Sequence, residues 1–426
     1  MDEEKKTKKK EGKERKPNWK EYMATVEDIE EFLRDHVYLR HNVVTGRTEC
    51  RIPESDVFAE WIAEGLPTNQ WLPVSDRIVN TLWRGLSKRK MVSAKNICQV
   101  IESDFSPDFH PFRYYLEHLP PWNGDDHILA MSVSVSVKGG VDQQMMFATY
   151  LKKWLVGMVA GWIDPAVVNN VILVLIGEQG SYKTTWFNYL LPPELQQYFR
   201  IKTNSSRMNK DDLLALTQYG LVCYEELDTM RPSELNQLKS AVTMPSVDER
   251  IPYDRYPNHR PHIASFCGTG NNTQFLSDPT GNRRWLPFEV ETITSPREMP
   301  FDYEGIYSQA YALCRDGFQY WFSRGEIQKL AEHNRQFETP HEEKELVNIY
   351  FRKPAELEPS EYIPVTRVKQ IVGGNMVNSI STVRLGRAFK ELGFEMKHTN
   401  TGNCYRVVQR SAQEIQSLLR TVPDDG

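Results

Sequence analysis

Residues 171–185, with the sequence VILVLIGEQGSYKTT, place a lysine and a threonine after a loop that contains two glycines. The apolar run before the loop is typical of a buried strand, and TTWFNYLL after it is compatible with a helix. Gly177 and Gly180 allow a tight turn that directs backbone N–H groups at phosphate oxygens. Lys183 can reach the β- and γ-phosphates, and the Thr184 hydroxyl can bind Mg²⁺. The pattern predicts a nucleoside triphosphate site formed by Gly177, Glu178, Gln179, Gly180, Ser181, Tyr182, Lys183, Thr184 and Thr185.

Tyr182 departs from the usual loop pattern, which has a third glycine immediately before the lysine. Because the position precedes a helix, we expect Tyr182 to hold a negative φ and the loop to fold without that glycine. The segment is interpreted as a phosphate loop with an altered rim.

Two acidic residues follow a second apolar strand, in YGLVCYEELD, some forty residues after the loop. Glu225 and Glu226 stand at its carboxyl end, where an open α/β sheet presents its ligand crevice. One carboxylate, with Thr184, can hold Mg²⁺, and the next can polarise the attacking water. A solvated strand end is the alternative, but the distance from the loop favours catalysis. Asp228 is expected to be an N-cap or to contact the site residues without contacting the nucleotide itself.

A third strand, PHIASFCGTGNN, ends in Asn271 and Asn272. An amide at this tip can orient water beside the γ-phosphate, although asparagine is also common in turns. The next segment, DPTGNRRWLPFEV, contains the neighbours Arg283 and Arg284, which point to opposite faces if the chain is extended. One could reach a neighbouring subunit's nucleotide as an arginine finger while the other braces its own site. A structural salt-bridge pair is the alternative.

The segment between the second and third strands combines basic and aromatic residues. Cations neutralise phosphates and aromatic rings stack on bases, so this composition suits a groove for single-stranded nucleic acid. An ordinary polar hairpin is almost equally well supported. The basic residues are Lys239, Arg250, Arg255 and Arg260, and the interleaved aromatics are Tyr253 and Tyr256.

The composition is that of a globular protein with two or three domains: 426 residues, 26% charged and 40% hydrophobic. A net charge of −5 gives no support for nucleic-acid binding, which must then depend on local patches. The six cysteines include no CxxC pair, which argues against a zinc site or a disulfide framework and favours a reducing cytoplasm. No signal peptide opens the sequence, and polar residues interrupt the apolar stretch 154–176, so we expect no membrane span.

The organisation along the chain follows from these patterns. Residues 1–16 are a lysine-rich tail expected to be disordered, and residues 17–128 form a helical amino-terminal domain. In that domain WKEYMATVEDIEEFLRDHVYL and SDRIVNTLWRGLSK have helical spacing, and LPPWNGDDHI ends it. Asp125 and Asp126 in this junction are expected to cap or turn the chain rather than to bind metal.

The nucleotide domain is expected over residues 129–350, and the polar, proline-containing segment 352–363 is expected to be a linker. Residues 360–426 contain two helical patterns, TRVKQIVGG and STVRLGRAFKELG. The strands FEMKH and CYRVV follow around a TNTGN turn. Helix, helix and hairpin in this order indicate a winged-helix-like domain.

Taken in order, WNGDDHI, GEQGSYKTTW, YEEL, ERIPYDR, GTGNN and DPTGNRRW resemble the virulence-associated protein E family of phages and other mobile elements. The match extends from about residue 100 to residue 340, and GNRRW after an asparagine-tipped strand is its most specific part. Proteins of this family are similar to superfamily III helicases within the AAA+ class of P-loop ATPases. Relatives usually carry glycine where this chain has Tyr182.

The resemblance implies an α/β P-loop core that uses ATP and Mg²⁺. It assigns Walker A to Lys183 and Thr184, Walker B to Glu225 and Glu226, the sensor to Asn271 and the finger to Arg283 or Arg284. It also implies a homo-oligomeric, hexameric ring acting on single-stranded or forked DNA in replication. Many relatives are fused to a primase, and because no zinc-ribbon cysteines occur here, a primase would be a separate protein.

Two other functions remain open at the level of sequence. The first is a non-translocating AAA+ switch that remodels or senses a protein partner in element defence or virulence. The second is a P-loop kinase of small molecules, which the asparagine tip and the arginine pair disfavour. Hydrolysis stimulated by single-stranded DNA separates the motor from the switch, and phosphate transfer to a metabolite would identify the kinase.

Overall fold

The computed structural model describes residues 22–203, 208–249, 258–276, 282–339, 342–373, 380–399 and 402–421. The chain divides into two compact units, Met1–Phe337 and Glu338–Gly426. The tail 1–16 and four residues of the basic segment lie outside the described residues: Arg250, Tyr253, Arg255 and Tyr256.

The amino-terminal part of the first unit has its own hydrophobic core, which includes Phe32, Leu33, Leu82 and Ile97. Its helices are α1 (Val26–His36), α2 (Ala59–Ala63), α3 (Asp76–Ser87) and α4 (Ala94–Ile101). The two helices expected from periodicity are confirmed as α1 and α3. The region is not purely helical, however, because it also contains a sheet in the order β3 (Trp71–Pro73), β2 (Arg47–Arg51), β1 (Tyr38–Asn42) and β4 (Asp108–Phe109).

Two short helices connect this region to the main sheet, α5 (Pro111–Glu117) and α6 (His127–Ser132). Asp126 is the N-cap of α6, and its carboxylate accepts a hydrogen bond from the Leu129 N–H at 3.1 Å. The expected capping role of this aspartate is thus confirmed. The same carboxylate is 2.5 Å from the Lys152 ammonium, which fixes α6 against the long helix α7 (Gly140–Ile163).

The main sheet of the first unit has six strands. Their order is β5 (Val135–Val137), β12 (Trp285–Ile293), β6 (Ile172–Ile176), β11 (Ser265–Gly270), β8 (Leu221–Tyr224) and β7 (Phe199–Lys202). The five strands from β12 to β7 are parallel, and β5 pairs antiparallel with β12. The three strands predicted from sequence are confirmed as β6, β8 and β11, and they are adjacent, with β11 in the middle.

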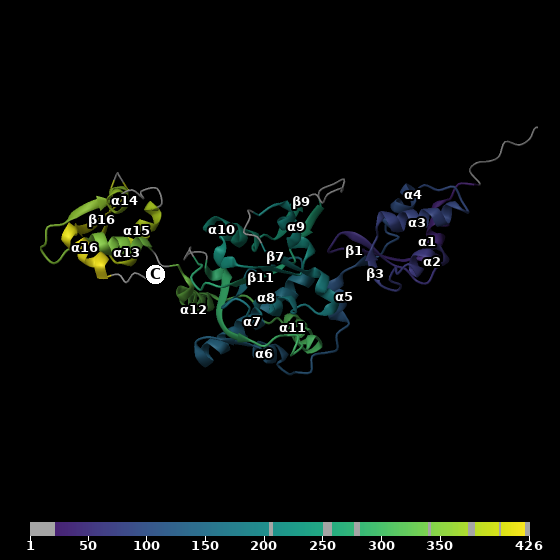
Figure 1. Ribbon diagram of the computed structural model, residues 1–426, viewed down its shortest axis with the longest axis horizontal. Helices are drawn as coiled ribbons and strands as arrows, with labels where there is room; N and C mark the ends of the chain where they lie inside the picture. Colours follow the sequence, from purple (N-terminus) through teal and green to yellow (C-terminus); the bar gives the residue numbers. More distant parts are fainter. Residues whose placement is uncertain are drawn as a thin grey trace, which may run out of the picture. The chain divides into compact units, whose positions relative to one another are not determined.

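Both faces of this sheet are covered by helices. Successive side chains of a strand point to opposite faces, and every residue of β6 is buried. Leu173 and Leu175 pack in the core that contains α7, whereas Ile172, Val174 and Ile176 belong to the opposite core. Figure 1 shows α9 (Lys210–Gln218) and α10 (Pro232–Ala241) on one side of the sheet and α7 with α11 (Tyr303–Arg315) on the other.

The basic segment includes an antiparallel hairpin formed by β9 (Ser246–Glu249) and β10 (Asn258–Pro261). The first unit ends after α12 (Arg324–Asn334), which packs near β12. Its remaining helical elements are α8 (Lys183–Asn188) and the short 3₁₀ helices η2 (Asp56–Phe58), η3 (Pro193–Tyr198), η4 (Leu227–Thr229), η5 (Asn282–Arg284) and η6 (Arg335–Phe337).

The second unit contains α13 (Glu342–Tyr350), α14 (Val365–Gly373), α15 (Thr382–Glu391) and α16 (Ala412–Thr421). Strand β16 (Gly402–Gln409) pairs with β13 (Phe351–Arg352), β14 (Glu361–Pro364) and β15 (Met396–Thr399). The predicted helix, helix and hairpin are confirmed as α14, α15 and the pair β15–β16.

The segment 352–363 is not a linker, contrary to its composition. It lies inside the second unit, because β13 and β14 at its two ends both pair with β16. Arg352 also pairs with Glu358 at 2.5 Å across the intervening turn, and this contact lowers the pKa of the Glu358 carboxyl to about 2. Polar and proline residues here form a surface connection within one fold rather than a spacer between two folds.

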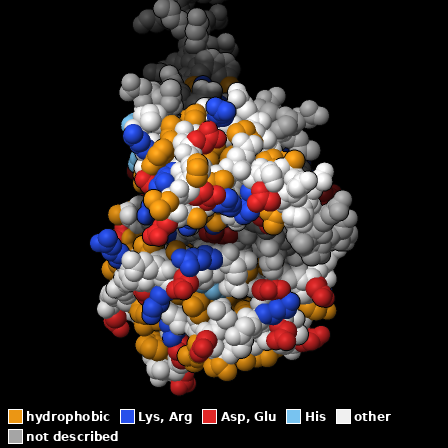
Figure 2. Space-filling view, turned by 90° about the vertical axis from the view of Figure 1, so that its left-hand side faces the viewer, with side chains coloured by type: hydrophobic (Ala, Val, Ile, Leu, Met, Phe, Trp, Pro, Cys, Tyr) orange, Lys and Arg blue, Asp and Glu red, His pale blue; other side chains and the backbone are white. Residues whose placement is uncertain are grey.

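The surface carries both signs of charge. On the face drawn in Figure 2, lysine and arginine side chains are interspersed with aspartate and glutamate. Attraction to a polyanion must therefore come from local groups of basic residues. Among the described helices, none is long and apolar enough to cross a membrane.

Candidate functional site

The three predicted site segments meet at one edge of the main sheet. Strands β6, β11 and β8 are parallel, so their carboxyl ends lie at the same edge. In register, Gly270 of β11 stands opposite Ile176 of β6, and Gly268 stands opposite Tyr224 of β8. The loop 177–182 follows β6, the acidic pair follows β8, and the asparagines follow β11. This is the edge where open α/β sheets bind ligands.

Two glycines of the loop are required by its geometry. The Gly177 N–H donates to the Gly270 carbonyl at 3.1 Å, and a Cβ on Gly177 would lie 3.1 Å from the Val290 carbonyl oxygen of β12. Gly180 has a φ of +84°, which side-chain-bearing residues rarely adopt. Within the described chain, the N–H groups of residues 178–182 donate to no carbonyl or side chain, so they are available to phosphate oxygens.

Lys183 is the charged centre of this loop. Its side chain is buried, and its ammonium donates to the carbonyls of Gly177 and Glu178, both at 2.7 Å. It also lies 3.2 Å from the Ser181 hydroxyl and 3.5 Å from Asn271 Oδ1. Burial lowers the pKa of the ammonium, and the Asp228 charge partly opposes this shift. A buried cation that has no ion pair among the described residues fits an anionic ligand such as a phosphate.

The structure corrects the expected backbone conformation of Tyr182. This residue has φ 61° and ψ 13°, in the left-handed region, rather than a negative φ. The reason is that α8 begins only at Lys183, so Tyr182 still belongs to the turn that redirects the chain from the loop into the helix. The third glycine of the usual pattern supplies this conformation without strain, and here a half-exposed tyrosine adopts it.

The acidic pair ends β8 as predicted. The Glu225 N–H donates to the Lys202 carbonyl at 3.0 Å, which continues the pairing with β7, and its side chain is half-buried. Glu226 is exposed and has φ 53° and ψ 47°, so the strand stops there. Left-handed backbone in a non-glycine residue costs about 1 kcal/mol or more and is concentrated at functional sites. The structure thus places Glu225 and Glu226 at a sharp turn on the edge that holds Lys183.

Asp228 links two of the strand ends and so has the second of the two roles expected for it, supporting the site. It is not an N-cap, because Glu226 precedes η4. Its Oδ2 accepts a hydrogen bond from the Asn272 N–H at 3.0 Å, and its Oδ1 is buried and has no hydrogen-bond partner among the described residues. The carboxylate therefore holds the asparagine turn against the end of β8, close enough to Lys183 to act on its charge.

The site offers oxygen ligands for a magnesium ion through the half-buried Thr184 and Glu225. Mg²⁺ in nucleotide sites is usually held by one or two protein oxygens together with phosphates and waters. In the described parts of the chain there is no group of three or more His, Cys, Asp or Glu side chains that could hold a metal ion alone. The donor set therefore fits a metal that arrives with a nucleotide.

Arg283 and Arg284 lie away from this site. They belong to η5, not to an extended segment as expected, and Trp285 immediately after them pairs with Ile172 at the start of β6. The loop follows the other end of β6, roughly 13 Å away for a five-residue strand. Neither arginine can brace the nucleotide site of its own chain from the amino-terminal edge.

The two arginines line a surface hollow of about 480 Å³ that they share with Asn170, Thr243 and Trp321. Arg283 is exposed and Arg284 is half-buried. Burial, together with the adjacent Arg283, lowers the pKa of the Arg284 guanidinium. Neither forms an ion pair with another described residue, and the lining contains no carboxylate. A structural salt-bridge pair is therefore not what the described structure contains.

The basic segment is less available than its sequence indicated. Lys239 lies on α10 and is only 8% exposed, and its ammonium is 3.4 Å from Asn236 Oδ1. Arg260 of β10 donates to the Val44 carbonyl at 3.4 Å. The hairpin also carries acidic side chains, and Asp248 pairs with His259 at 2.6 Å. The two remaining predicted nucleic-acid contacts, Arg250 and Arg255, lie outside the described residues.

Comparisons with known proteins give one family match. The model of the virulence-associated protein E-like domain matches residues 116–339. The interval contains the loop, the acidic pair, the asparagine turn and the arginine pair. No curated protein matches the chain.

Two kinds of solved structure are similar to this one. The apo C-terminal region of NrS-1 is 10% identical, with a TM-score of 0.47 over 90% of this chain and 98% of that chain. A second form of the same region has a TM-score of 0.42. A RuvB mutant from Thermotoga maritima is 16% identical, with a TM-score of 0.24 over 65% of this chain and 96% of that one. Since the family model spans more than half of the 426 residues, this chain belongs to the virulence-associated protein E-like family.

Proposed function

We propose that this protein is an ATP-hydrolysing, ring-forming motor that acts on DNA. The observation that carries the proposal is the position of Lys183. Its buried ammonium lies inside a glycine loop that follows a central parallel strand, and within 3.5 Å of the amide at the tip of the next strand. A cation, free loop N–H groups and a polar strand tip together favour a bound triphosphate over an uncharged ligand.

Each residue of the site has a distinct role in this proposal. Lys183 binds the β- and γ-phosphates, and Thr184 with Glu225 would hold Mg²⁺, which neutralises phosphate charge when bound. Glu226 accepts a proton from the attacking water, and Asn271 orients that water. The left-handed turn at Glu226 supports this division, since it separates the two glutamates at the strand end.

The position of the arginines is consistent with an assembly. Arg283 and Arg284 are at the edge of the sheet opposite to the loop, so if either of them completes a nucleotide site, that site belongs to another subunit. Their hollow, which has cationic but no acidic lining, is suited to an anion presented by a neighbouring copy. A ring in which each subunit supplies an arginine to the next satisfies both observations, and a hexamer is the expected form.

Membership of the family supports DNA as the substrate, because the family resembles superfamily III helicases. Arg250 and Arg255 are the proposed contacts of the core with single-stranded or forked DNA, since the described structure engages Lys239 and Arg260 elsewhere. A primase, where one takes part, is proposed to be a separate protein.

ATP turnover and mass in solution, measured with and without single-stranded DNA, test this function. We expect ATP to favour a larger assembly and single-stranded DNA to raise turnover severalfold. The Arg250→Ala, Arg255→Ala double variant should lose the stimulation and keep the basal rate. Turnover that does not respond to DNA would contradict the motor and favour the nucleotide switch that remodels a protein partner.

A further inference from the structure

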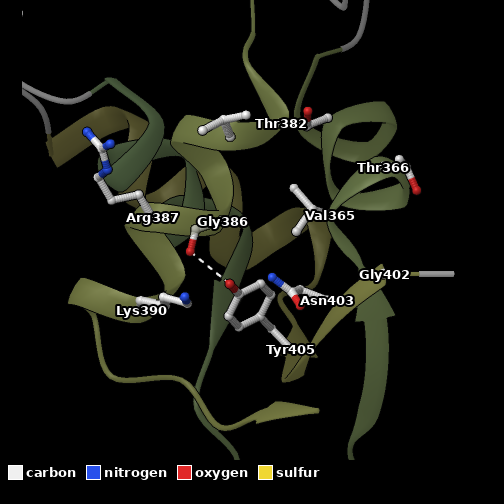
Figure 3. A pocket seen from close by; sticks show the side chains of 10 residues that line it. Val365, Thr366, Thr382, Gly386, Arg387, Lys390, Gly402, Asn403 and Tyr405 are labelled. Carbon is white, nitrogen blue, oxygen red and sulfur yellow. Dashed lines mark hydrogen bonds between the residues drawn. The ribbon is translucent and has the colours of Figure 1, made fainter. Parts of the chain in front are cut away.

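The second unit contains a groove of about 500 Å³ with a one-sided charge. It lies between α14, α15 and the β15–β16 hairpin, and Figure 3 shows side chains of α15 and α14 around it. Arg387 and Lys390 supply positive charge, Thr366, Thr382 and Asn403 supply hydrogen-bonding groups, and the lining contains no carboxylate. In the described part of the chain neither Arg387 nor Lys390 has an ion-pair partner.

The sequence around the groove is also strongly basic. Between residues 365 and 410 there are eight lysines and arginines and two acids, Glu391 and Glu395. Both acids are already paired, Glu391 with Lys344 at 2.5 Å and Glu395 with Arg406 at 3.1 Å. The charge near the groove that is not neutralised by these ion pairs is therefore positive, and it is complementary to a polyanion.

The outward face of α15 has a glycine that the fold itself does not require. Val383, Gly386, Arg387 and Lys390 follow helical spacing and all line the groove. A Cβ on Gly386 would lie 3.6 Å from the Tyr405 hydroxyl and 3.8 Å from Val365 Cγ2, which are ordinary contacts. Glycine inside a helix makes the helix less stable than alanine does. A glycine at a position where alanine fits leaves room for a ligand to approach the helix backbone closely.

We propose that this groove binds duplex DNA, with α15 against the base edges and the hairpin beside the sugar-phosphate backbone. Arg387 and Lys390 would contact phosphates or guanines, and the hydroxyl and amide groups would contact phosphates. Val383, whose side chain is 72% exposed, is suited to a thymine methyl group. This binding site is separate from the nucleotide site and does not depend on the proposed motor activity.

The aromatic content of the groove distinguishes duplex from single-stranded DNA. Single strands are usually bound by exposed rings on which bases stack. Tyr405 is the aromatic residue of the lining, and it is buried, with its hydroxyl donating to the Gly386 carbonyl at 2.9 Å. Figure 3 shows this hydrogen bond, which turns the ring inward rather than offering its face to a base. A helix face with cations suits the major groove of B-form DNA, whereas that of A-form RNA is too narrow.

The test uses the full-length protein, without nucleotide, and a fluorescent 20-base-pair DNA duplex at several salt concentrations. The Arg387→Gln, Lys390→Gln double variant should bind about tenfold more weakly or worse, and the slope of log affinity against log salt should fall by about 2. The matched control is Lys344→Gln, Arg384→Gln, which removes the same charge from residues paired with glutamates outside the groove. The control should bind like the parent.

Gly386→Ala gives a second, independent readout, because it changes no charge. We expect it to melt no lower than the parent and to bind the duplex at least several-fold more weakly. Parental affinity in the groove double variant, or an equal loss in the control pair, would overturn the proposal. Parental affinity in Gly386→Ala would overturn the close approach to the helix. Competition by a polyglutamate peptide as effective as duplex DNA would assign the groove to acidic proteins instead. ATP turnover without DNA should be unchanged in all these variants, which separates this result from the fate of the proposed motor.

Discussion

At the scale of single residues, the phosphate loop carries strain at Tyr182. Its φ of 61° is unfavourable for a residue with a Cβ, by about 1 kcal/mol. The cost does not come from the tyrosine ring, which is half-exposed, but from the backbone conformation before α8. Substitution by alanine removes the ring but keeps the Cβ, whereas substitution by glycine removes both. The two substitutions should therefore have different effects on stability.

We expect the free energy of unfolding of Tyr182→Gly to exceed that of Tyr182→Ala by about 1 kcal/mol, so that the glycine variant melts at a higher temperature. This order reverses the one found inside helices, where alanine is preferred. Tyr182→Gly should also retain ATP turnover, with affinity changed by about tenfold at most, or 1.4 kcal/mol. Thermal melting of the two variants beside the parent measures the difference. An alanine variant as stable as the glycine variant would mean that the backbone at residue 182 is not strained.

The sequence predicts the partners of Lys183 better than the conformation of its neighbour. Lys183 and Asn271 follow apolar strands, and strands that are parallel and adjacent must bring their ends together. The φ of Tyr182 depends instead on where the first turn of α8 begins, which residue type does not fix. The sequence left two roles open for Asp228 and did not identify its partner, because the Asn272 N–H is far away in sequence.

At the scale of elements, Asp228 couples the end of β8 to the end of β11. Its carboxylate receives the Asn272 N–H, and Asn271 beside it reaches Lys183. The acidic turn and the asparagine turn are therefore held in one arrangement by a single side chain. Loss of that hydrogen bond should disturb water positioning more than phosphate binding.

We expect Asp228→Ala to lower ATP turnover at least tenfold, about 1.4 kcal/mol in the barrier, while ATP affinity changes by only a few-fold. Asp228→Asn keeps an oxygen that can accept from the Asn272 N–H, so it should retain most of the turnover. Steady-state rates and nucleotide affinities of both variants provide the comparison. Equal activity of the alanine variant and the parent would show that β8 and β11 do not need this link.

Elements were predictable where their pattern is local. The apolar runs of β6, β8 and β11 indicate buried strands, and the amphipathic runs of α1, α3, α14 and α15 indicate helices. The sheet of the amino-terminal region was not predictable, because β3 and β4 are short and His41 of β1 pairs with the distant Asp108. The turn η5 was mistaken for an extended segment because GNRR has no periodicity that would reveal a helical turn.

At the scale of the whole molecule, three histidines make the first unit sensitive to acid: His262 and His333 are buried, and His110 is half-buried. Burial lowers the pKa of His110, to about 4, and also lowers the pKa values of His262 and His333. The unfolded chain binds protons near pH 6.5, whereas the folded chain keeps these rings neutral. The contribution of these neutral rings to the free energy of unfolding is therefore fully present above pH 6.5, and it is lost as the pH falls from there toward 4.

We expect the melting temperature to fall as the pH is lowered from 7.5 to 5. His333→Gln should reduce this fall, because glutamine can still donate to the Pro287 carbonyl and does not titrate in this range. His118→Gln is the control, since it replaces an exposed ring that forms no ion pair with a described residue. A melting temperature that is constant across this range would contradict burial of the three rings as neutral groups.

Assembly is the second property of the whole molecule, and the separation of the arginines from the loop makes it testable. If Arg284 completes the site of the next subunit, turnover per subunit must rise with protein concentration. Arg284→Ala and Lys183→Ala subunits should each be nearly inactive and should partly recover activity when mixed, because some interfaces regain an intact loop facing an intact arginine. Absence of recovery at every mixing ratio would show that Arg284 does not act between subunits.

ATP binding and phosphate release, measured on the same preparations of three proteins, test the nucleotide site most directly. The parent should bind and hydrolyse ATP in the presence of Mg²⁺. Lys183→Ala should lose most of its ATP affinity. Glu226→Gln should bind ATP like the parent, and its rate of phosphate release should be at least about a hundredfold lower. A Lys183→Ala protein that binds and hydrolyses ATP like the parent would contradict the assignment of residues 177–185 as the phosphate loop.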